Sequence, residues 1–202
     1  MTSSRSDQIA GIVLAAGAST RMSENKLLLE LEDETLIERC VKRVLAAELD
    51  PVVVVLGYEA DLVRRRIGSL PIHVIVNDRY EMGMSSSLGI AVAELGDNVS
   101  AVCVVLADMP FVTTKMLREV VSRYRESGAP LVVSRYGSIN APPTLFDHAL
   151  FTELRASEGE EMGKRLVERY RDAAEIVEWP EAALADVDEP DDYERALKIS
   201  LQ

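Results

Sequence analysis

Residues 9–31, IAGIVLAAGASTRMSENKLLLEL, decide the fold of this chain. Residues 9–16 form a continuous apolar run, which predicts a strand buried on both faces within a parallel sheet. The run breaks at Gly17 into a segment of small and polar residues that carries two cations, Arg21 and Lys26. Open α/β sheets bind ligands at the carboxyl ends of their strands, and backbone N–H groups in an uncrowded turn can bind phosphate oxygens. We therefore predict a phosphate-binding loop in which Arg21 and Lys26 neutralise phosphate charge.

The same stretch also has a simpler interpretation. A strand followed by a surface loop with two solvated cations would have the same composition. Two familiar phosphate motifs are absent, since the chain contains neither GxxxxGK[ST] nor GxGxxG. The sequence therefore argues against a P-loop ATPase and against a dinucleotide-binding dehydrogenase of the usual type.

Length and composition narrow the class of protein. The chain has 202 residues, of which 48% are apolar, and a formal charge of −12. The length predicts one domain over residues 1–202, with the polar residues 1–8 flexible. The negative charge argues against nucleic acids and anionic membranes as partners. We expect a cytoplasmic protein, because there is no run of ~20 apolar residues and no apolar signal-peptide core. Cys40 and Cys103 lie in apolar periodic stretches, which indicates buried reduced thiols.

Strand-like and helix-like patterns alternate along the chain. Strands are predicted at residues 9–16, 52–56, 71–76, 101–107, 130–134 and 176–179. Helices are predicted at residues 34–49, 59–67, 86–95, 114–126 and 162–170. This alternation predicts an α/β fold of three Rossmann-like layers, with a mostly parallel sheet and helices on both faces. Residues 136–146 are predicted to form a loop because they contain Gly, Asn and Pro.

A second informative stretch is residues 77–88, NDRYEMGMSSSL. We expect Gly83 to mark a tight turn and Ser85 to cap the helix that follows, whose exposed N–H groups would make an anion site. The alternative is a helix cap without a ligand. A hydrolase nucleophile elbow is excluded, since GxSxG is absent.

Acidic residues mark two further candidate positions. Asp108 follows the apolar run 101–107, so it lies at the rim where a Mg²⁺ ion could use its carboxylate together with substrate phosphates. It could equally begin an Asp-x-Pro turn. Near the carboxyl terminus, the acids that begin at Asp186 would ordinarily form a solvated helix start.

Together these motifs resemble those of the nucleotidyltransferases that activate molybdopterin, within the nucleotide-diphosphosugar-transferase superfamily. The resemblance is carried by LAAGASTRMxxxKLL, NxxxxxGMSSSL, LxDMP and DxDxPxDY, and it extends from residue 9 to residue 197. It implies that the first loop binds the triphosphate of a nucleotide through Leu14, Ala15, Ala16, Gly17, Ser19, Arg21 and Lys26. It implies a second substrate at Asn77, Gly83, Met84, Ser85 and Ser86. It also implies catalytic roles for Arg21 and Lys26, and Mg²⁺ held by Asp108 and Asp188, with Asp186 as the second choice for the latter.

The resemblance further implies a reaction. A nucleoside monophosphate would pass from an NTP to the phosphate of molybdenum-loaded molybdopterin, with release of pyrophosphate. Ala16 and the GMSSSL segment resemble the cytidylyl branch of the family, which implies CTP, and a xanthine-dehydrogenase-type enzyme as recipient. The chain departs from the family at Ala141 and Glu160, which leaves room for a sugar-phosphate or alcohol-phosphate acceptor. A non-catalytic chaperone that holds the molybdenum cofactor is the alternative from another class.

Overall fold

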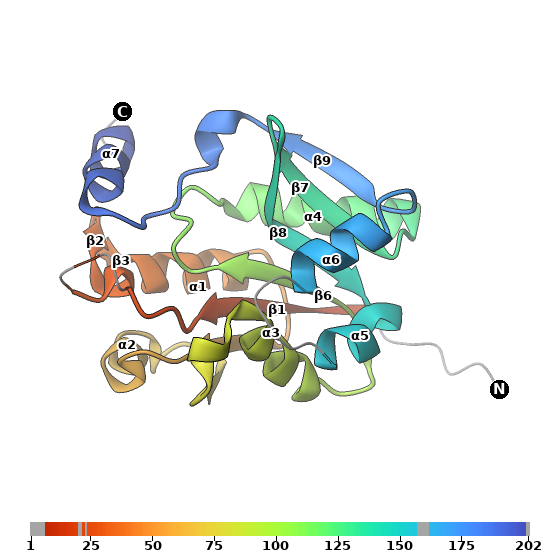
Figure 1. The fold of residues 1–202 in the computed structure, drawn as a ribbon, viewed down its shortest axis with the longest axis horizontal. Coiled ribbons are helices and arrows are strands. Elements are labelled where there is room, and N and C mark those ends of the chain that lie inside the picture. The colour runs from red at the N-terminus through yellow and green to blue at the C-terminus, as the bar shows by residue number, and fades with distance from the viewer. Residues whose placement is uncertain (1–6, 20–21, 23, 157–161, 201–202) are drawn as a thin grey trace.

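The centre of the protein is a seven-stranded sheet with strand order β5-β4-β1-β6-β8-β7-β9 (Figure 1). The structure is a computed structural model, and it describes residues 7–19, 22, 24–156 and 162–200. The strands of this sheet are β1 (Gln8–Ala15), β4 (Val52–Leu56), β5 (His73–Val76), β6 (Val99–Leu106), β7 (Leu131–Tyr136), β8 (Ile139–Asp147) and β9 (Glu175–Trp179). All the neighbouring pairs are parallel except those that involve β8. The predicted mostly parallel sheet is therefore confirmed.

Strand β1 lies between β4 and β6 and is covered on both faces. Val13 is paired with Val54 on one side and with Val105 on the other. Alternate side chains of β1 enter different apolar clusters, with Val13 in one and Ile12 and Leu14 in the other. The two-residue repeat of an extended strand thus explains why this run is apolar at every position.

Helices cover both faces of the sheet, as the alternation predicts (Figure 1). Three helices contribute to one apolar cluster, namely α1 (Leu36–Ala46), α2 (Ala60–Ile67) and α4 (Thr114–Ser127). Three others contribute to the opposite cluster, namely α3 (Met84–Ala93), α5 (Phe151–Arg155) and α6 (Met162–Arg169). None of the helices formed by the described residues has the length and apolar character that crossing a membrane requires.

The last helix, α7 (Pro190–Ser200), belongs to a separate small cluster beside the hairpin of β2 (Glu30–Leu31) and β3 (Glu34–Thr35). We call this the carboxyl-terminal cluster, and its buried members are Leu31, Leu36, Val187 and Ala196. The hydroxyl of Tyr193 on α7 donates to the carbonyl oxygen of Glu30 at 2.5 Å. These contacts place the segment that precedes α7 at the carboxyl end of the sheet (Figure 1).

One prediction is wrong: residues 136–146 are not a loop. β8 forms a hairpin with β7 through a turn at Gly137, which has φ +60, and it also pairs antiparallel with β6. Pro142 and Pro143 lack N–H donors, yet they lie where the β7–β8 register shifts, between the paired residues Asn140 and Thr144. A bulge tolerates proline because its residues make no regular ladder bonds, and this explains why the composition was misleading.

The two cysteines are confirmed as free, buried thiols. Burial raises the pKa of Cys40 to about 12 and that of Cys103 likewise to about 12. Only the thiolate is a nucleophile, so we expect neither residue to react with a disulfide reagent at about pH 8 in the folded protein. Both should react at once in guanidinium chloride. Labelling of one thiol under native conditions would show that the strand or helix that carries it opens in the folded protein.

Candidate active site

The candidate residues gather at the carboxyl ends of neighbouring strands. β1 leads into the first loop, β6 ends two residues before Asp108, and β5 ends one residue before Asn77. The loops are joined by backbone hydrogen bonds: Ala107 N–H donates to Leu14 O at 3.1 Å, and Tyr58 N–H donates to Ala16 O at 3.4 Å. The sheet therefore brings together three sequence stretches that are far apart along the chain.

The first loop combines buried and open positions. Leu14, Ala15 and Ala16 are buried, whereas a Cβ added at Gly17 would meet no atom of the described residues within 4 Å, apart from those of its chain neighbours. Ser19 adopts a left-handed backbone conformation with φ 50, and its Oγ accepts a hydrogen bond from the backbone N–H of Lys26 at 3.2 Å. Arg21, predicted to be catalytic, lies outside the described residues. The loop thus leaves room for a ligand above Gly17 while tying its two ends together.

Lys26 is the central cation of the site. It begins a short 3₁₀ helix, Lys26–Leu28, whose cap is Asn25, and only 8% of the residue is exposed. Its Nζ lies 2.6 Å from Asp108 Oδ2 and 2.6 Å from Asp188 Oδ1. Burial alone would lower the pKa of Lys26, but the charges and hydrogen bonds of Asp108 and Asp188 outweigh burial and raise it. The ammonium is therefore charged at neutral pH.

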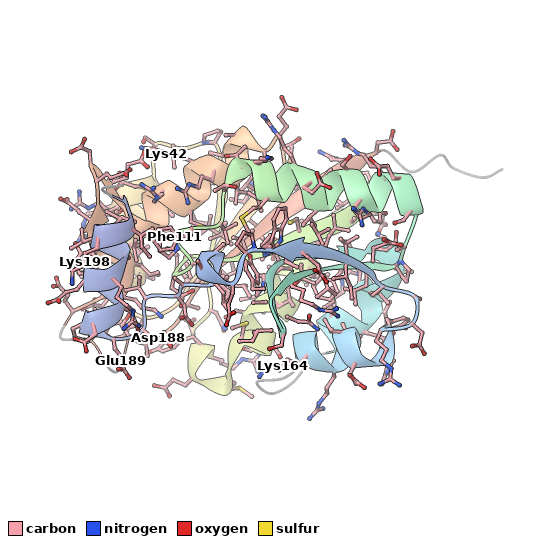
Figure 2. The ribbon with its side chains drawn as sticks, turned by 90° about the horizontal axis from the view of Figure 1, so that it is seen from above. Lys42, Phe111, Lys164, Asp188, Glu189 and Lys198 are labelled. Carbon is pink, nitrogen blue, oxygen red and sulfur yellow. The ribbon has the colours of Figure 1, made fainter. Side chains whose placement is uncertain are left out.

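Backbone contacts hold the two carboxylates together independently of Lys26. The N–H of Val187 donates to the carbonyl oxygen of Asp108 at 3.0 Å, which fixes the next residue, Asp188, beside Asp108. Asp192 accepts hydrogen bonds from the N–H groups of Asp188 at 3.1 Å and of Glu189 at 2.8 Å, so it caps the start of α7. In Figure 2, Asp188 lies on the segment that leads into α7. Two acidic residues that are far apart along the chain are thus neighbours in the folded protein.

This arrangement fits a hard divalent cation. Asp108 Oδ1 is buried and has no hydrogen-bond partner among the described residues. No group of three or more His, Cys, Asp or Glu side chains suited to a metal occurs in the part of the chain that the structure describes. Mg²⁺ typically takes one or two carboxylates and completes its shell with phosphates and water, so two carboxylates are sufficient.

Asp186, the second choice for a metal ligand, is placed differently. Among the described residues, Lys26 pairs with Asp188 and not with Asp186. Partial burial of its carboxyl, followed by the negative charges of Asp188 and Asp108, raises the pKa of Asp186. Its side chain is therefore near the acidic pair without sharing the ammonium.

The second stretch is built around Asn77, which is 4% exposed. Its side-chain amide donates to the hydroxyls of Ser86 and Ser87, at 2.9 Å each, and its Oδ1 accepts from the N–H of Arg79 at 3.0 Å. An amide has two N–H donors, and both are engaged in these bonds. Asn77 thus anchors the beginning of α3, whatever further contact it makes.

The predicted cap of this helix is wrong by position. α3 begins at Met84 and its cap residue is Gly83, with φ 96 and no side-chain cap bond, so Ser85 lies inside the first turn and is buried. Glycine adopts this positive φ without the steric cost that another residue would meet, and the helix is therefore capped two residues earlier than the predicted Ser85. Ser86 Oγ donates to the carbonyl oxygen of Gly83 at 2.8 Å, and Met84 is exposed.

Sequence reasoning missed Gly57 and Arg43. A Cβ at Gly57 would lie 2.6 Å from the carbonyl oxygen of Ala16 and 2.8 Å from Tyr80, so only glycine lets these loops approach. Arg43 Nη1 donates to the carbonyl oxygen of Pro110, and to that of Val112 at 2.7 Å. Burial lowers the pKa of Arg43. The signal for Arg43 in the sequence is weak, because a single arginine near the apolar stripe of a helix is common.

Replacing Arg43 by methionine should destabilise the protein by about 2 kcal/mol, because two carbonyl groups lose a charged donor. The free energy of unfolding in urea measures this change. Lys42→Met is the matched control, since Lys42 on the same helix makes an ion pair with Glu34 at 2.8 Å between exposed side chains. Equal stability of the two variants would show that Arg43 does not hold the turn after Asp108.

A mostly parallel α/β sheet that brings an open loop, a buried lysine and two convergent carboxylates together at its carboxyl edge is the arrangement of an α/β enzyme with a ligand site at this edge. The chain belongs to the family of MobA-like NTP transferase domains, which matches residues 11–174. It is therefore a nucleotidyltransferase with the fold of the nucleotide-diphosphosugar transferases. The matched range includes Lys26 and Asp108 and ends before Asp188.

Three similar proteins extend over almost the whole chain. The purine catabolism protein PucB of Bacillus subtilis is 30% identical over 204 residues, covering 94% of this chain and 96% of PucB. The crystal structure of Rv0371c from Mycobacterium tuberculosis has a TM-score of 0.85 at 30% identity, covering 96% of this chain and 98% of that one. Another structure of Rv0371c is a complex with manganese. A nucleotidyl transferase from Methanothermobacter has a TM-score of 0.81 at 25% identity and covers 96% and 98% of the two chains.

Proposed function

We propose that this enzyme transfers a cytidylyl group from CTP to the phosphate of molybdenum-loaded molybdopterin and releases pyrophosphate. The observation that carries the nucleotidyl-transfer part is the contact of Lys26 with Asp108 and Asp188 beside the open first loop. The acceptor and the base are inferred from the sequence motifs, among them Ala16 and the GMSSSL segment.

In this proposal the triphosphate lies along residues 14–19, with Lys26 and Arg21 next to its phosphates. A phosphate oxygen of the acceptor attacks the α-phosphorus, a new P–O bond forms, and the bond to the β-phosphate oxygen breaks as pyrophosphate leaves. The protein supplies position and charge: Lys26 and Arg21 stabilise the negative charge that passes to pyrophosphate. No covalent nucleophile on the protein is needed.

Asp108 and Asp188 would hold Mg²⁺, which when bound supplies a positive charge that polarises the phosphate oxygens. The buried, unpartnered Oδ1 of Asp108 supports this assignment. The manganese complex of Rv0371c also supports a divalent metal. The two aspartates lie side by side but come from segments that are far apart along the chain, so the ion would be held by both only when the segment that carries Asp188 is docked on Asp108.

The acceptor side is assigned to Asn77, Gly83, Met84, Ser85 and Ser86. The first turn of α3 presents backbone N–H groups and the positive end of the helix dipole, both of which favour a phosphate. Asn77 fixes this turn through Ser86 and Ser87. The exposed side chain of Met84 offers an apolar, polarizable surface to a flat ring system.

Pyrophosphate release tests this proposal, with Mg²⁺ and intact molybdenum-loaded molybdopterin as acceptor and CTP, GTP, ATP and UTP compared in parallel. Release with CTP alone is expected. Release with GTP would keep the mechanism and overturn the base assignment. Release only with a sugar phosphate or alcohol phosphate would replace the acceptor, as Ala141 and Glu160 allow.

The alternative of a cofactor-holding chaperone has its own signature. It predicts cofactor binding that is unchanged in Asp108→Asn and no pyrophosphate with any nucleotide. If the enzyme instead makes the cytidylyl product, that product would pass to an enzyme of the xanthine dehydrogenase type. Activation of such an enzyme by the reaction mixture, and its absence when CTP is omitted, would support that partner.

A further inference from the structure

The ion-pair geometry of Lys26 has a consequence for metal binding. Its Nζ is equidistant from one oxygen of Asp108 and one oxygen of Asp188, at 2.6 Å each. An ammonium at this point neutralises the same two carboxylates that a divalent cation would use. Two positive charges so close to one another repel, and a carboxylate oxygen that accepts a short hydrogen bond from Lys26 is less available as a ligand.

We propose that Lys26 and the divalent cation compete for the carboxylates of Asp108 and Asp188, so that the metal binds tightly only when the triphosphate draws Lys26 away. This inference rests on the proposed function and adds a rule about order: nucleotide and metal bind together, and the metal alone binds weakly. Lys26 is then an exchangeable cation, paired first with carboxylates and afterwards with phosphate oxygens.

The surroundings of Lys26 permit this exchange. Its backbone is fixed by Ser19, so only the side chain has to move, and a lysine side chain has a flexible four-carbon stem with three rotatable donors. The carboxylates do not depend on the ammonium for their positions. Val187 links the two acidic segments through the backbone, and Asp192 caps the segment that carries Asp188. The pair thus remains assembled when Lys26 leaves.

Competition makes an unusual prediction for Lys26→Met. Removing the cation should increase the affinity of the protein for Mn²⁺ in the absence of nucleotide by about tenfold or more, because the repulsion and the competing hydrogen bonds are lost. Titration of the purified full chain with Mn²⁺, followed by electron paramagnetic resonance of the free ion, gives the dissociation constant without any turnover.

Two controls locate the effect. Lys42→Met removes the same charge elsewhere on the molecule, away from Asp188 in Figure 2, and should leave the Mn²⁺ affinity unchanged. Adding Asp108→Asn to Lys26→Met should abolish the gain. If Lys26→Met does not fold, as judged by circular dichroism, Lys26→Gln replaces it because the neutral amide is closer to lysine in polarity.

Equal or weaker Mn²⁺ binding by the lysine variant than by the wild-type protein would overturn the competition. This outcome is distinct from failure of the proposed function, which is decided by pyrophosphate release with CTP and molybdopterin. A protein that uses another acceptor would still show the gain in Mn²⁺ affinity. If the wild-type protein transfers the cytidylyl group but Lys26→Met shows no gain in Mn²⁺ affinity, the proposed function stands and the competition between Lys26 and the metal is wrong.

Discussion

Lys26→Ala should lower the turnover number for nucleotidyl transfer at least about a hundredfold, equivalent to ~3 kcal/mol of transition-state stabilisation. The reason is that the negative charge passing to pyrophosphate loses a buried ammonium in a site where water screens charge poorly. Steady-state pyrophosphate release measures the effect, and urea unfolding shows whether the fold is retained. Lys42→Ala is the matched control and should keep the wild-type rate.

This result would separate binding from catalysis in one variant. The enzyme without Lys26 is expected to bind the metal more tightly and yet to react more slowly. The reason is that the ammonium of Lys26 helps the reaction only after it has left the carboxylates of Asp108 and Asp188. If Lys26→Ala keeps more than about a tenth of the wild-type turnover, Lys26 does not have the catalytic role proposed for it.

Asp188→Asn should also reduce turnover at least about a hundredfold, whereas Asp186→Asn should change it by less than about threefold. The difference arises because Asp188 faces Asp108 through a shared contact with Lys26, and Asp186 does not. Asparagine preserves the shape of each side chain, so the comparison isolates the charge. The second measurement is the Mg²⁺ concentration that gives half of the maximal rate. This concentration should rise only in Asp188→Asn, because only that variant loses a metal ligand.

The reverse pattern would assign the metal to Asp186 and would show that the ion pair with Lys26 does not mark the ligand. Equal losses in both variants would mean that the whole acidic segment acts by its charge. Both patterns would contradict the role of Asp188 as the second metal ligand.

Continuous apolar runs made the central strands predictable. β4 occupies residues 52–56 as expected, and β1 carries the first loop at its carboxyl end. Burial on both faces leaves such a strand no room for polar residues, so its pattern is unambiguous. β8 was missed because its local composition favours a loop, while its pairing with β6 and β7 is a tertiary effect.

The candidate site was predictable in part. Lys26 and Asp108 follow from their positions after buried strands, but Asp188 could be named only through a resemblance. No local pattern shows that a segment so much later in the chain docks on Asp108, since this contact depends on the packing of α7 against the β2–β3 hairpin. Asn77 illustrates the converse: the sequence marks it as a polar site residue, and only the structure reveals its bonds to Ser86 and Ser87.

The carboxyl-terminal cluster has few buried residues, and a small core of this kind can open separately from a large sheet. The amide proton of Val187 is well placed to report such an opening, because its acceptor is the carbonyl oxygen of Asp108. Its rate of hydrogen exchange therefore measures how often the two halves of the acidic pair separate. Exchange at this one amide therefore reports the fraction of molecules in which the segment of Asp188 is docked on Asp108 and both carboxylates are in place.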